Sequence, residues 1–188
     1  MKRLAISCAL TLLAAITMTT AAQAQFEDEE FVPPPPFRKG LWMSAGAGWG
    51  TQGCSACTGR LDGVSGALVV GGSLSDQFLV GAAVGGWTTT ADDGTRLSVL
   101  AADCRFRIYP SAFGKWFITF GAGMSTISDG VFGPTVAGEF GTSFMIGTGF
   151  DVRVSSGLSI TPYVGISGAK TENLDANIGH AGLAITIH

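Results

Sequence analysis

Charged side chains recur at alternate positions in two stretches of the sequence. Asp103, Arg105 and Arg107 alternate with apolar residues, and Asp151 and Arg153 repeat the same spacing. Residues two apart in an extended chain point to the same side, so each set would share one face of a strand. If that face is buried, the charges are costly unless they are paired. The spacing predicts an interior ion-pair network, and a gated pore or a cradle for a small ligand are the functional alternatives.

A C-x-x-C motif, formed by Cys54 and Cys57, lies in the glycine-rich stretch GCSACTG. In an exported protein this spacing favours a small disulfide. A zinc site needs about four ligands, and it would have to recruit His180 with the acidic residues Asp62 and Asp175. We therefore expect a disulfide, with no resident metal or cofactor.

Strands are the elements that would position these residues. From Gly138 to Val154, one set of alternate residues is mostly apolar, including Phe140, Phe144 and Ile146, whereas the other set is mostly small or polar. This period of two is typical of a β-strand. Seven further stretches alternate in the same way, with apolar faces that begin at Leu41, Val64, Phe78, Leu100, Trp116, Leu158 and Ala181. Each is close to the roughly 9 to 11 residues that a tilted transmembrane strand needs.

The composition indicates what the apolar faces contact. Charged residues make up only 13% of the chain, against about 25% in soluble domains. No run outside the N-terminal region reaches the roughly 18 apolar residues of a membrane-spanning helix. These features predict an all-β fold, an eight-stranded antiparallel up-and-down transmembrane β-barrel with lipid outside and small or polar side chains inside. Acidic residues outnumber basic ones by 14 to 11, which argues against a nucleic-acid partner.

The predicted links between strands alternate in length. Short links at residues 75–77, 110–114 and 155–157 alternate with longer ones near 51–62, 89–95, 128–137 and 171–177. Short periplasmic turns and longer outer loops are typical of outer-membrane barrels. The alternation therefore predicts that both ends of the barrel domain lie in the periplasm.

The N-terminal region divides into two segments that precede the barrel domain. Residues 1–24 have a basic start, an apolar centre and an A-x-A ending, which predicts a signal peptide cleaved between Ala24 and Gln25. Residues 25–39 are acidic and then carry four consecutive prolines, which favour an extended periplasmic lead-in. Residues 40–188 would form the outer-membrane barrel domain.

The signal peptide, the eight alternating segments and the terminal strands GLWMSAGAGWG and HAGLAITIH carry a family resemblance. Together they resemble the small outer-membrane β-barrel proteins of Gram-negative bacteria, the OmpA/OmpX-like superfamily. The resemblance implies a C-terminal assembly signal, which the barrel-assembly machinery would recognise, at Gly182, Ile185, Ile187 and His188. Two positions depart from the family, since His188 stands in place of an aromatic residue and Ala181 in place of a polar one.

The resemblance also implies an integral outer-membrane protein in contact with outer-membrane lipid and lipopolysaccharide. We expect a structural or surface-interaction role without catalysis, for a surface partner that the sequence does not identify. A narrow, porin-like channel or a small-ligand carrier is one alternative, and a lipid A-modifying enzyme is another. Enzymatic barrels of this kind use a histidine with a serine and an acid, but no such pattern surrounds His180, the one histidine predicted on the outer side.

Overall fold

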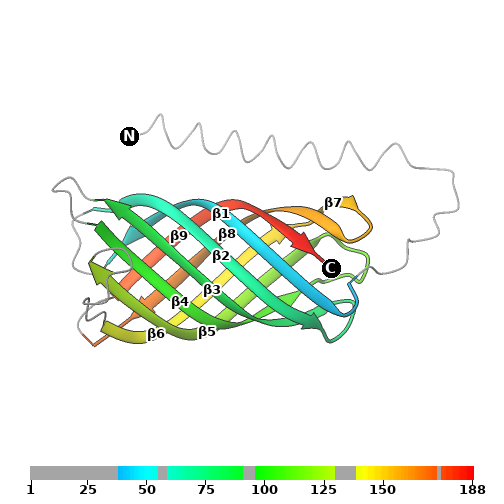
Figure 1. The fold of residues 1–188 in the computed structure, drawn as a ribbon, viewed down its shortest axis with the longest axis horizontal. Coiled ribbons are helices and arrows are strands. Elements are labelled where there is room, and N and C mark those ends of the chain that lie inside the picture. The colour runs from blue at the N-terminus through cyan, green and yellow to red at the C-terminus, as the bar shows by residue number, and fades with distance from the viewer. Residues whose placement is uncertain (1–37, 55–58, 91–95, 130–138, 173–174) are drawn as a thin grey trace, which may run out of the picture. The chain divides into compact units, whose positions relative to one another are not determined.

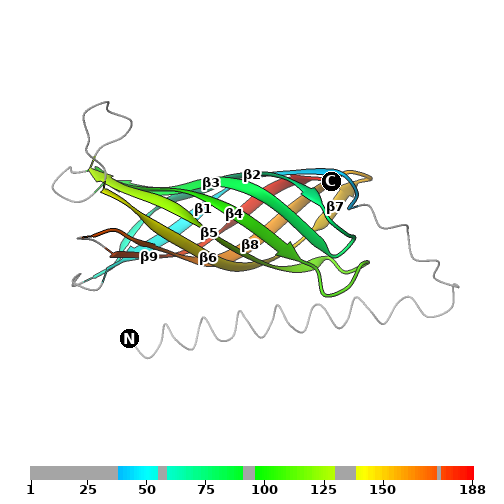
Figure 2. The same ribbon diagram turned by 90° about the horizontal axis from the view of Figure 1, so that it is seen from below.

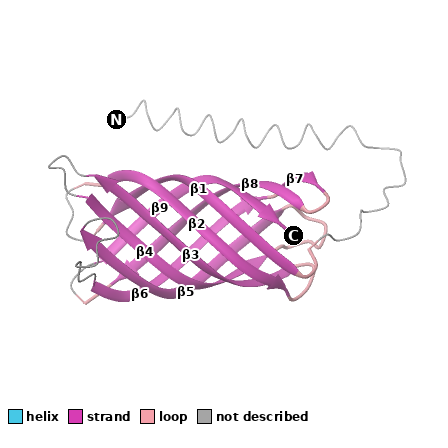
Figure 3. Cartoon of the chain, viewed as in Figure 1, coloured by secondary structure: helices cyan, strands magenta, loops and turns pink. Residues whose placement is uncertain are grey.

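The computed structural model of the chain describes residues 38–54, 59–90, 96–129, 139–172 and 175–188. Within these ranges the chain forms strands that wind around one barrel (Figures 1 and 3). The strands are β1 (Leu41–Gly53), β2 (Leu61–Ser73), β3 (Phe78–Thr90), β4 (Arg96–Ile108), β5 (Trp116–Asp129), β6 (Glu139–Phe150), β7 (Val152–Ser155), β8 (Leu158–Lys170) and β9 (Asp175–Ile187). No helix among the described residues is long and apolar enough to cross a membrane.

Antiparallel hydrogen bonding closes the barrel, as the turned view in Figure 2 also shows. Each strand from β1 to β5 pairs with the next, β8 pairs with β9, and β9 returns to pair with β1. Both β6 and β7 pair with β8, so these two strands together form one barrel strand that is interrupted at Asp151. The barrel therefore has eight strands in up-and-down order, which confirms the predicted fold class.

The two faces of the barrel wall differ as the alternation predicts. On β4, Leu100 and Cys104 are exposed on the outside, whereas Arg105 and Arg107 are buried in the interior. Large apolar side chains are exposed on all nine strands in the same way. Such a surface is unfavourable in water but matches the hydrocarbon region of a bilayer. The outer surface therefore has the character of a lipid-facing wall.

Glycines allow the wall to close where β1 meets β9. Gly48 and Gly182 face each other across this pair of strands. A Cβ atom at Gly48 would overlap the backbone oxygen of Ala181, and one at Gly182 would overlap the backbone oxygen of Ala47. Any larger residue at either position would push the two strands apart. Gly182 thus has a structural role at the closing pair of strands.

The barrel has two unlike ends. We name one the turn end, where residues 74–77, 109–115 and 156–157 link the strands, and the other the loop end, where residues 54–60, 91–95, 130–138 and 171–174 link them. The predicted alternation of link lengths is wrong in one place, because link 109–115 is longer than links 91–95 and 171–174. The reason is that β3, β4, β8 and β9 each contain 13 residues. Of these strands, β3 and β9 include residues that the sequence pattern placed in loops, 89–90 and 175–177.

Candidate functional site

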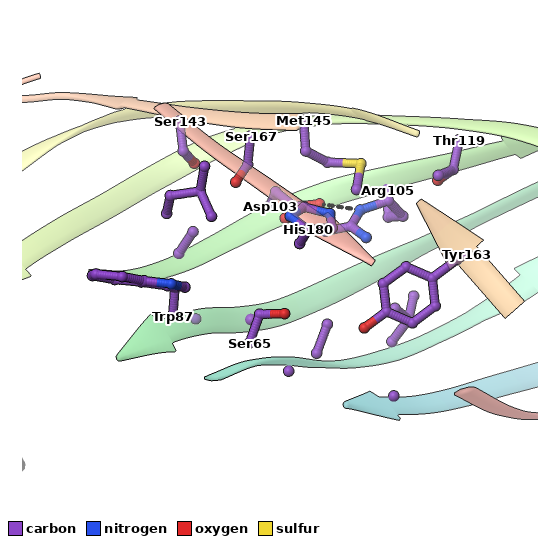
Figure 4. Close-up of a pocket in the computed structure, with 18 of the residues that line it drawn as sticks. Ser65, Trp87, Asp103, Arg105, Thr119, Ser143, Met145, Tyr163, Ser167 and His180 are labelled. Atoms are coloured by element: carbon purple, nitrogen blue, oxygen red, sulfur yellow. Dashed lines mark hydrogen bonds and ion pairs between the residues drawn. The ribbon is translucent and has the colours of Figure 1, made fainter. Parts of the chain in front are cut away.

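The interior of the barrel is the candidate functional site, and buried side chains divide it into three levels. An apolar cluster at the loop end contains Trp87, Val99, Ala169, Ala176 and Ile178. A second cluster at the turn end contains Trp42, Val69, Leu79, Ala83, Tyr109 and Phe117. Between them lies a cavity of about 120 Å³ whose wall carries polar and charged residues (Figure 4).

An ion pair supplied by β4 lies in this central cavity (Figure 4). Arg105 Nε donates to Asp103 Oδ1, and a terminal guanidinium nitrogen donates to Oδ2, both over 2.7 Å. This two-point geometry is the strongest form of an arginine–carboxylate contact. It engages both oxygens of Asp103, so the charges of Asp103 and Arg105 neutralise each other within β4.

Neutral polar groups line the cavity around this ion pair. The rings of Tyr163 and His180 meet edge to face with their centroids 6.1 Å apart. Ser65 Oγ is buried and has no hydrogen-bond partner among the described residues. Thr119, in contrast, donates its hydroxyl to the backbone oxygen of Phe106 over 2.9 Å. His180 thus lines the interior of the barrel.

The carboxylate of Asp151 is the hub of the turn end. Tyr109 donates its hydroxyl to Oδ2, and Thr161 donates to Oδ1, both over 2.7 Å. His188 Nε2, from the residue after β9, lies 3.4 Å from Oδ2. Asp151 itself is only 1% exposed. One buried carboxylate therefore joins link 109–115, β8 and the end of β9.

Hydroxyl groups extend this hub across the pair of strands that closes the barrel. Thr161 Oγ1 lies 3.0 Å from Thr186 Oγ1 on β9, which in turn lies 3.0 Å from Ser44 Oγ on β1. All three side chains are buried. Buried hydroxyls in a connected chain satisfy one another and fix a single arrangement. The contacts thus tie Asp151 to the register of β1, β8 and β9.

The hub sets the protonation of its two acidic groups. Burial alone would raise the pKa of the Asp151 carboxyl. The contact with His188, the charge of Arg107 and the hydrogen bonds from Tyr109 and Thr161 outweigh burial and hold that pKa below its ordinary value. For Tyr109, burial above all raises the pKa of the phenol. Asp151 is therefore an ionised acceptor, and Tyr109 is a protonated donor.

Two arginines complete the turn end. Arg38, the residue two before Gly40, places its guanidinium 3.4 Å from the centre of the Tyr109 ring. It also donates to the backbone oxygens of Asp76, Ala112 and Gly114, and so bridges links 74–77 and 109–115. Arg107 lies over the rings of two buried aromatic residues, Trp42 at 4.6 Å and Phe117 at 4.0 Å. Aromatic faces stabilise both cations where little water reaches them.

The charged residues that the sequence singles out fall into two groups. Asp103, Arg105 and Arg107 line the cavity. Arg107 and Asp151 meet the turn-end cluster, so Arg107 belongs to both groups. Arg153 is exposed on β7, so it does not join the buried charges. It pairs with Ser159, whose side chain is buried in the interior, so Arg153 keeps the inner-face position that alternation predicts. The pairing of β7 with β8 shifts register only after Arg153, between Arg153 and Ser155.

The remaining sequence-predicted residues are distributed as follows. Cys54 is disulfide-bonded, while Cys57 lies outside the described residues. Ala24 and Gln25, the predicted cleavage site, also lie outside them. Ile185 and Ile187 are exposed on the outer face, and His188 lies at the hub. Among the described residues, no group of three or more His, Cys, Asp or Glu side chains could hold a metal ion.

Several residues of the site are absent from the sequence prediction. Tyr109 directly precedes the predicted link 110–114 and shares the parity of Asp103, Arg105 and Arg107, which is a signal for the interior. Arg38 falls in the predicted lead-in 25–39 and carries no such signal. Thr161 and Thr186 carry a detectable signal, since each alternates with apolar residues that face outward. Their shared contact with Asp151 depends on how the strands are staggered, which alternation alone does not specify.

The closed eight-stranded wall, the apolar exterior and the filled interior define the class of small transmembrane barrels of the outer-membrane type. No protein-family model matches the chain, and no curated protein matches its sequence. Among solved structures, it is similar to Neisserial surface protein A (NspA), with 13% identity and a TM-score of 0.57 over 79% of this chain and 97% of that one. It is also similar to Ail, the attachment invasion locus protein of Yersinia pestis, with 10% identity and a TM-score of 0.56 over 79% of this chain and 99% of that one. These comparisons confirm the resemblance at the level of the fold.

Proposed function

We propose that the protein is an integral outer-membrane barrel that acts as a closed scaffold and presents its loop end to a partner at the cell surface. The observation that carries this proposal is the closure of the interior. Trp42 and Tyr109 are 0% exposed at the turn end, and Trp87 is 3% exposed at the loop end. Permeation needs a continuous water path, which these side chains occupy. The two similar structures are named as a surface protein and an attachment protein, which supports a role in surface contact.

The same proposal assigns an orientation and a route of assembly. The turn end would face the periplasm and the loop end the outside, with lipid and lipopolysaccharide around the apolar wall. Export would begin with cleavage between Ala24 and Gln25, and a disulfide between Cys54 and Cys57 would form at the loop end. The barrel-assembly machinery would recognise Gly182, Ile185, Ile187 and His188. No catalytic step is part of this proposal.

Solute flux tests the closed scaffold against the channel alternative. The purified protein is refolded into liposomes, and folding is verified by heat-modifiable migration in a gel. We expect the folded protein to leave the release of a small entrapped dye unchanged relative to empty liposomes. Release that requires folded protein would favour the narrow channel and contradict the proposal.

Surface labelling tests the orientation. In a background in which Cys104 is replaced by serine, single cysteines are introduced at Thr90 on the loop end and at Lys115 on the turn end, both exposed positions. A membrane-impermeant maleimide should label Thr90→Cys but not Lys115→Cys in intact cells. Lysed cells provide the control, because both positions should then react. The opposite labelling pattern would show that the barrel is inverted.

A further inference from the structure

We propose that the central cavity binds one small anion, of the size of bromide or formate, between the two apolar clusters. Asp103 is the single carboxylate among the described residues that line the cavity, whereas Arg105 and Arg107 both line it. Both oxygens of Asp103 already accept hydrogen bonds from Arg105. The wall therefore carries one guanidinium more than carboxylates. An anion is the ligand that complements such a wall.

Arg107 is a buried cation that forms no ion pair with the described residues. Its side chain is 6% exposed, and its Nε has no hydrogen-bond partner among the described residues. Its contacts are the rings of Trp42 and Phe117 and the hydroxyl of Tyr109, 3.4 Å away. Within the described part of the chain, no carboxylate forms an ion pair with it. A buried cation without a contacting anion is costly, so binding of an anion would be favourable.

Asp151 is not a counter-ion in direct contact with Arg107. Its Oδ1 accepts from Thr161, and its Oδ2 accepts from Tyr109 and lies near His188. The carboxylate is thus engaged on both oxygens at the turn end. Arg107 interacts with it only through space, whereas the cavity lies directly at the Arg107 side chain.

Ser65 gives an independent sign that the cavity takes a polar occupant. Its Oγ is buried, lacks any partner among the described residues and lines the same cavity (Figure 4). Buried hydroxyls are nearly always hydrogen-bonded, to protein or to an occupant of the site. The volume of about 120 Å³ exceeds several-fold the roughly 10–15 Å³ that one water requires. A small anion with a few waters therefore fits, whereas a bulky anion does not.

The test measures thermal unfolding of the folded barrel in detergent while formate replaces a bulky sulfonate at constant ionic strength. A ligand that binds only the folded state raises the melting temperature with its concentration. We expect formate to raise it in the wild type and the apparent affinity to fall at least about tenfold in Arg107→Gln, the scale of one charge-assisted hydrogen bond. Arg153→Gln is the matched control, because Arg153 is exposed on β7, and it should respond as the wild type does.

Two further measurements keep the proposal testable if Arg107→Gln fails to fold. Ser65→Ala removes one unpartnered hydroxyl without adding volume and should fold, yet weaken the response to formate. Crystals of the wild type grown in bromide should show an anomalous peak inside the cavity. Equal responses in the wild type and Ser65→Ala, no response to formate, or bromide at the outer surface only would each overturn the anion site. None of these outcomes depends on the surface role, which solute flux and labelling test separately.

Discussion

The two ends of the barrel interior are closed by different kinds of contact. The loop end buries an apolar cluster, in which Trp87 Nε1 donates to the backbone oxygen of Gly50 over 3.1 Å. The turn end buries Arg38, Asp151 and His188 together with aromatic rings. Apolar contacts tolerate changes of shape, whereas hydrogen-bonded charges require a particular geometry. We infer that the turn end depends on particular contacts more than the apolar cluster of the loop end does.

The turn end gains this specificity from residues far apart in the sequence. Arg38 precedes β1, Asp151 separates β6 from β7, and His188 follows β9. The hydroxyl contact between Thr186 and Ser44, which extends the hub to β1, forms only when β9 pairs with β1 and the ring closes. We infer that the hub couples closure of the wall to satisfaction of a buried charge. Substitutions at each end test whether the two ends contribute differently to stability.

The largest effect is expected for Asp151→Ala at the hub. The change removes the acceptor for Tyr109 and Thr161 and leaves Arg107 without its nearest negative charge. Removal of one partner from a buried charged cluster typically costs about 3–5 kcal/mol. Urea unfolding in detergent, followed by heat-modifiable migration, measures the loss. Asp62→Ala is the control, since Asp62 is exposed near the loop end. Equal losses of the free energy of unfolding in the two variants would show that the contacts of Asp151 do not stabilise the barrel.

A smaller effect is expected for Tyr109→Phe. This variant keeps the ring that packs on Arg38 and Phe117 but removes the hydroxyl that donates to Asp151. A hydrogen bond to a charged group is worth about 1.5–3 kcal/mol. Tyr163→Phe makes the same chemical change in the central cavity and should cost less. If the cavity variant loses as much free energy of unfolding as the hub variant, the hydrogen bond to Asp151 does not determine the stability of the turn end.

The sequence predicted the wall far better than the contents of the barrel. Alternation is local, so Phe140, Phe144 and Ile146 reveal an outward face without knowledge of any other strand. The hub is different, because Asp151, Thr161 and His188 meet only through the stagger of strands around the ring. The same locality explains why alternation gives the face of Arg153 but not its exposure, since exposure depends on how far β7 extends at the turn end. The composition of residues 25–39 predicts a lead-in that includes Arg38, although Arg38 contacts the links of the turn end.

The pH dependence of the free energy of unfolding should reflect the ionisation of Asp151 and Tyr109. The pKa of Asp151 lies below its ordinary value of 3.8, so its contribution is present above that value and is lost as the pH falls toward the folded pKa. The pKa of Tyr109 lies above its ordinary value of 10.0, so its contribution is present below pH 10 and is lost above it. We expect urea midpoints to fall in acid for the wild type and less so for Asp151→Asn. In Tyr109→Phe, the urea midpoint should fall less above pH 10 than it does in the wild type. If both variants lose stability with pH as the wild type does, Asp151 and Tyr109 are not the source of the pH dependence.

The smallest effect is expected at the loop end, for Ile178→Leu. Ile178 is 4% exposed and packs in the apolar cluster with Trp87 and Val99. A swap that conserves apolar volume usually costs less than about 1.5 kcal/mol, because neighbouring side chains repack. The urea midpoint should therefore shift less than in Tyr109→Phe, although Ile178→Leu changes the branching of the side chain and Tyr109→Phe removes one oxygen. A loss as large as that of Tyr109→Phe would show that the loop end is packed as specifically as the turn end, and the contrast between the two ends would then fail.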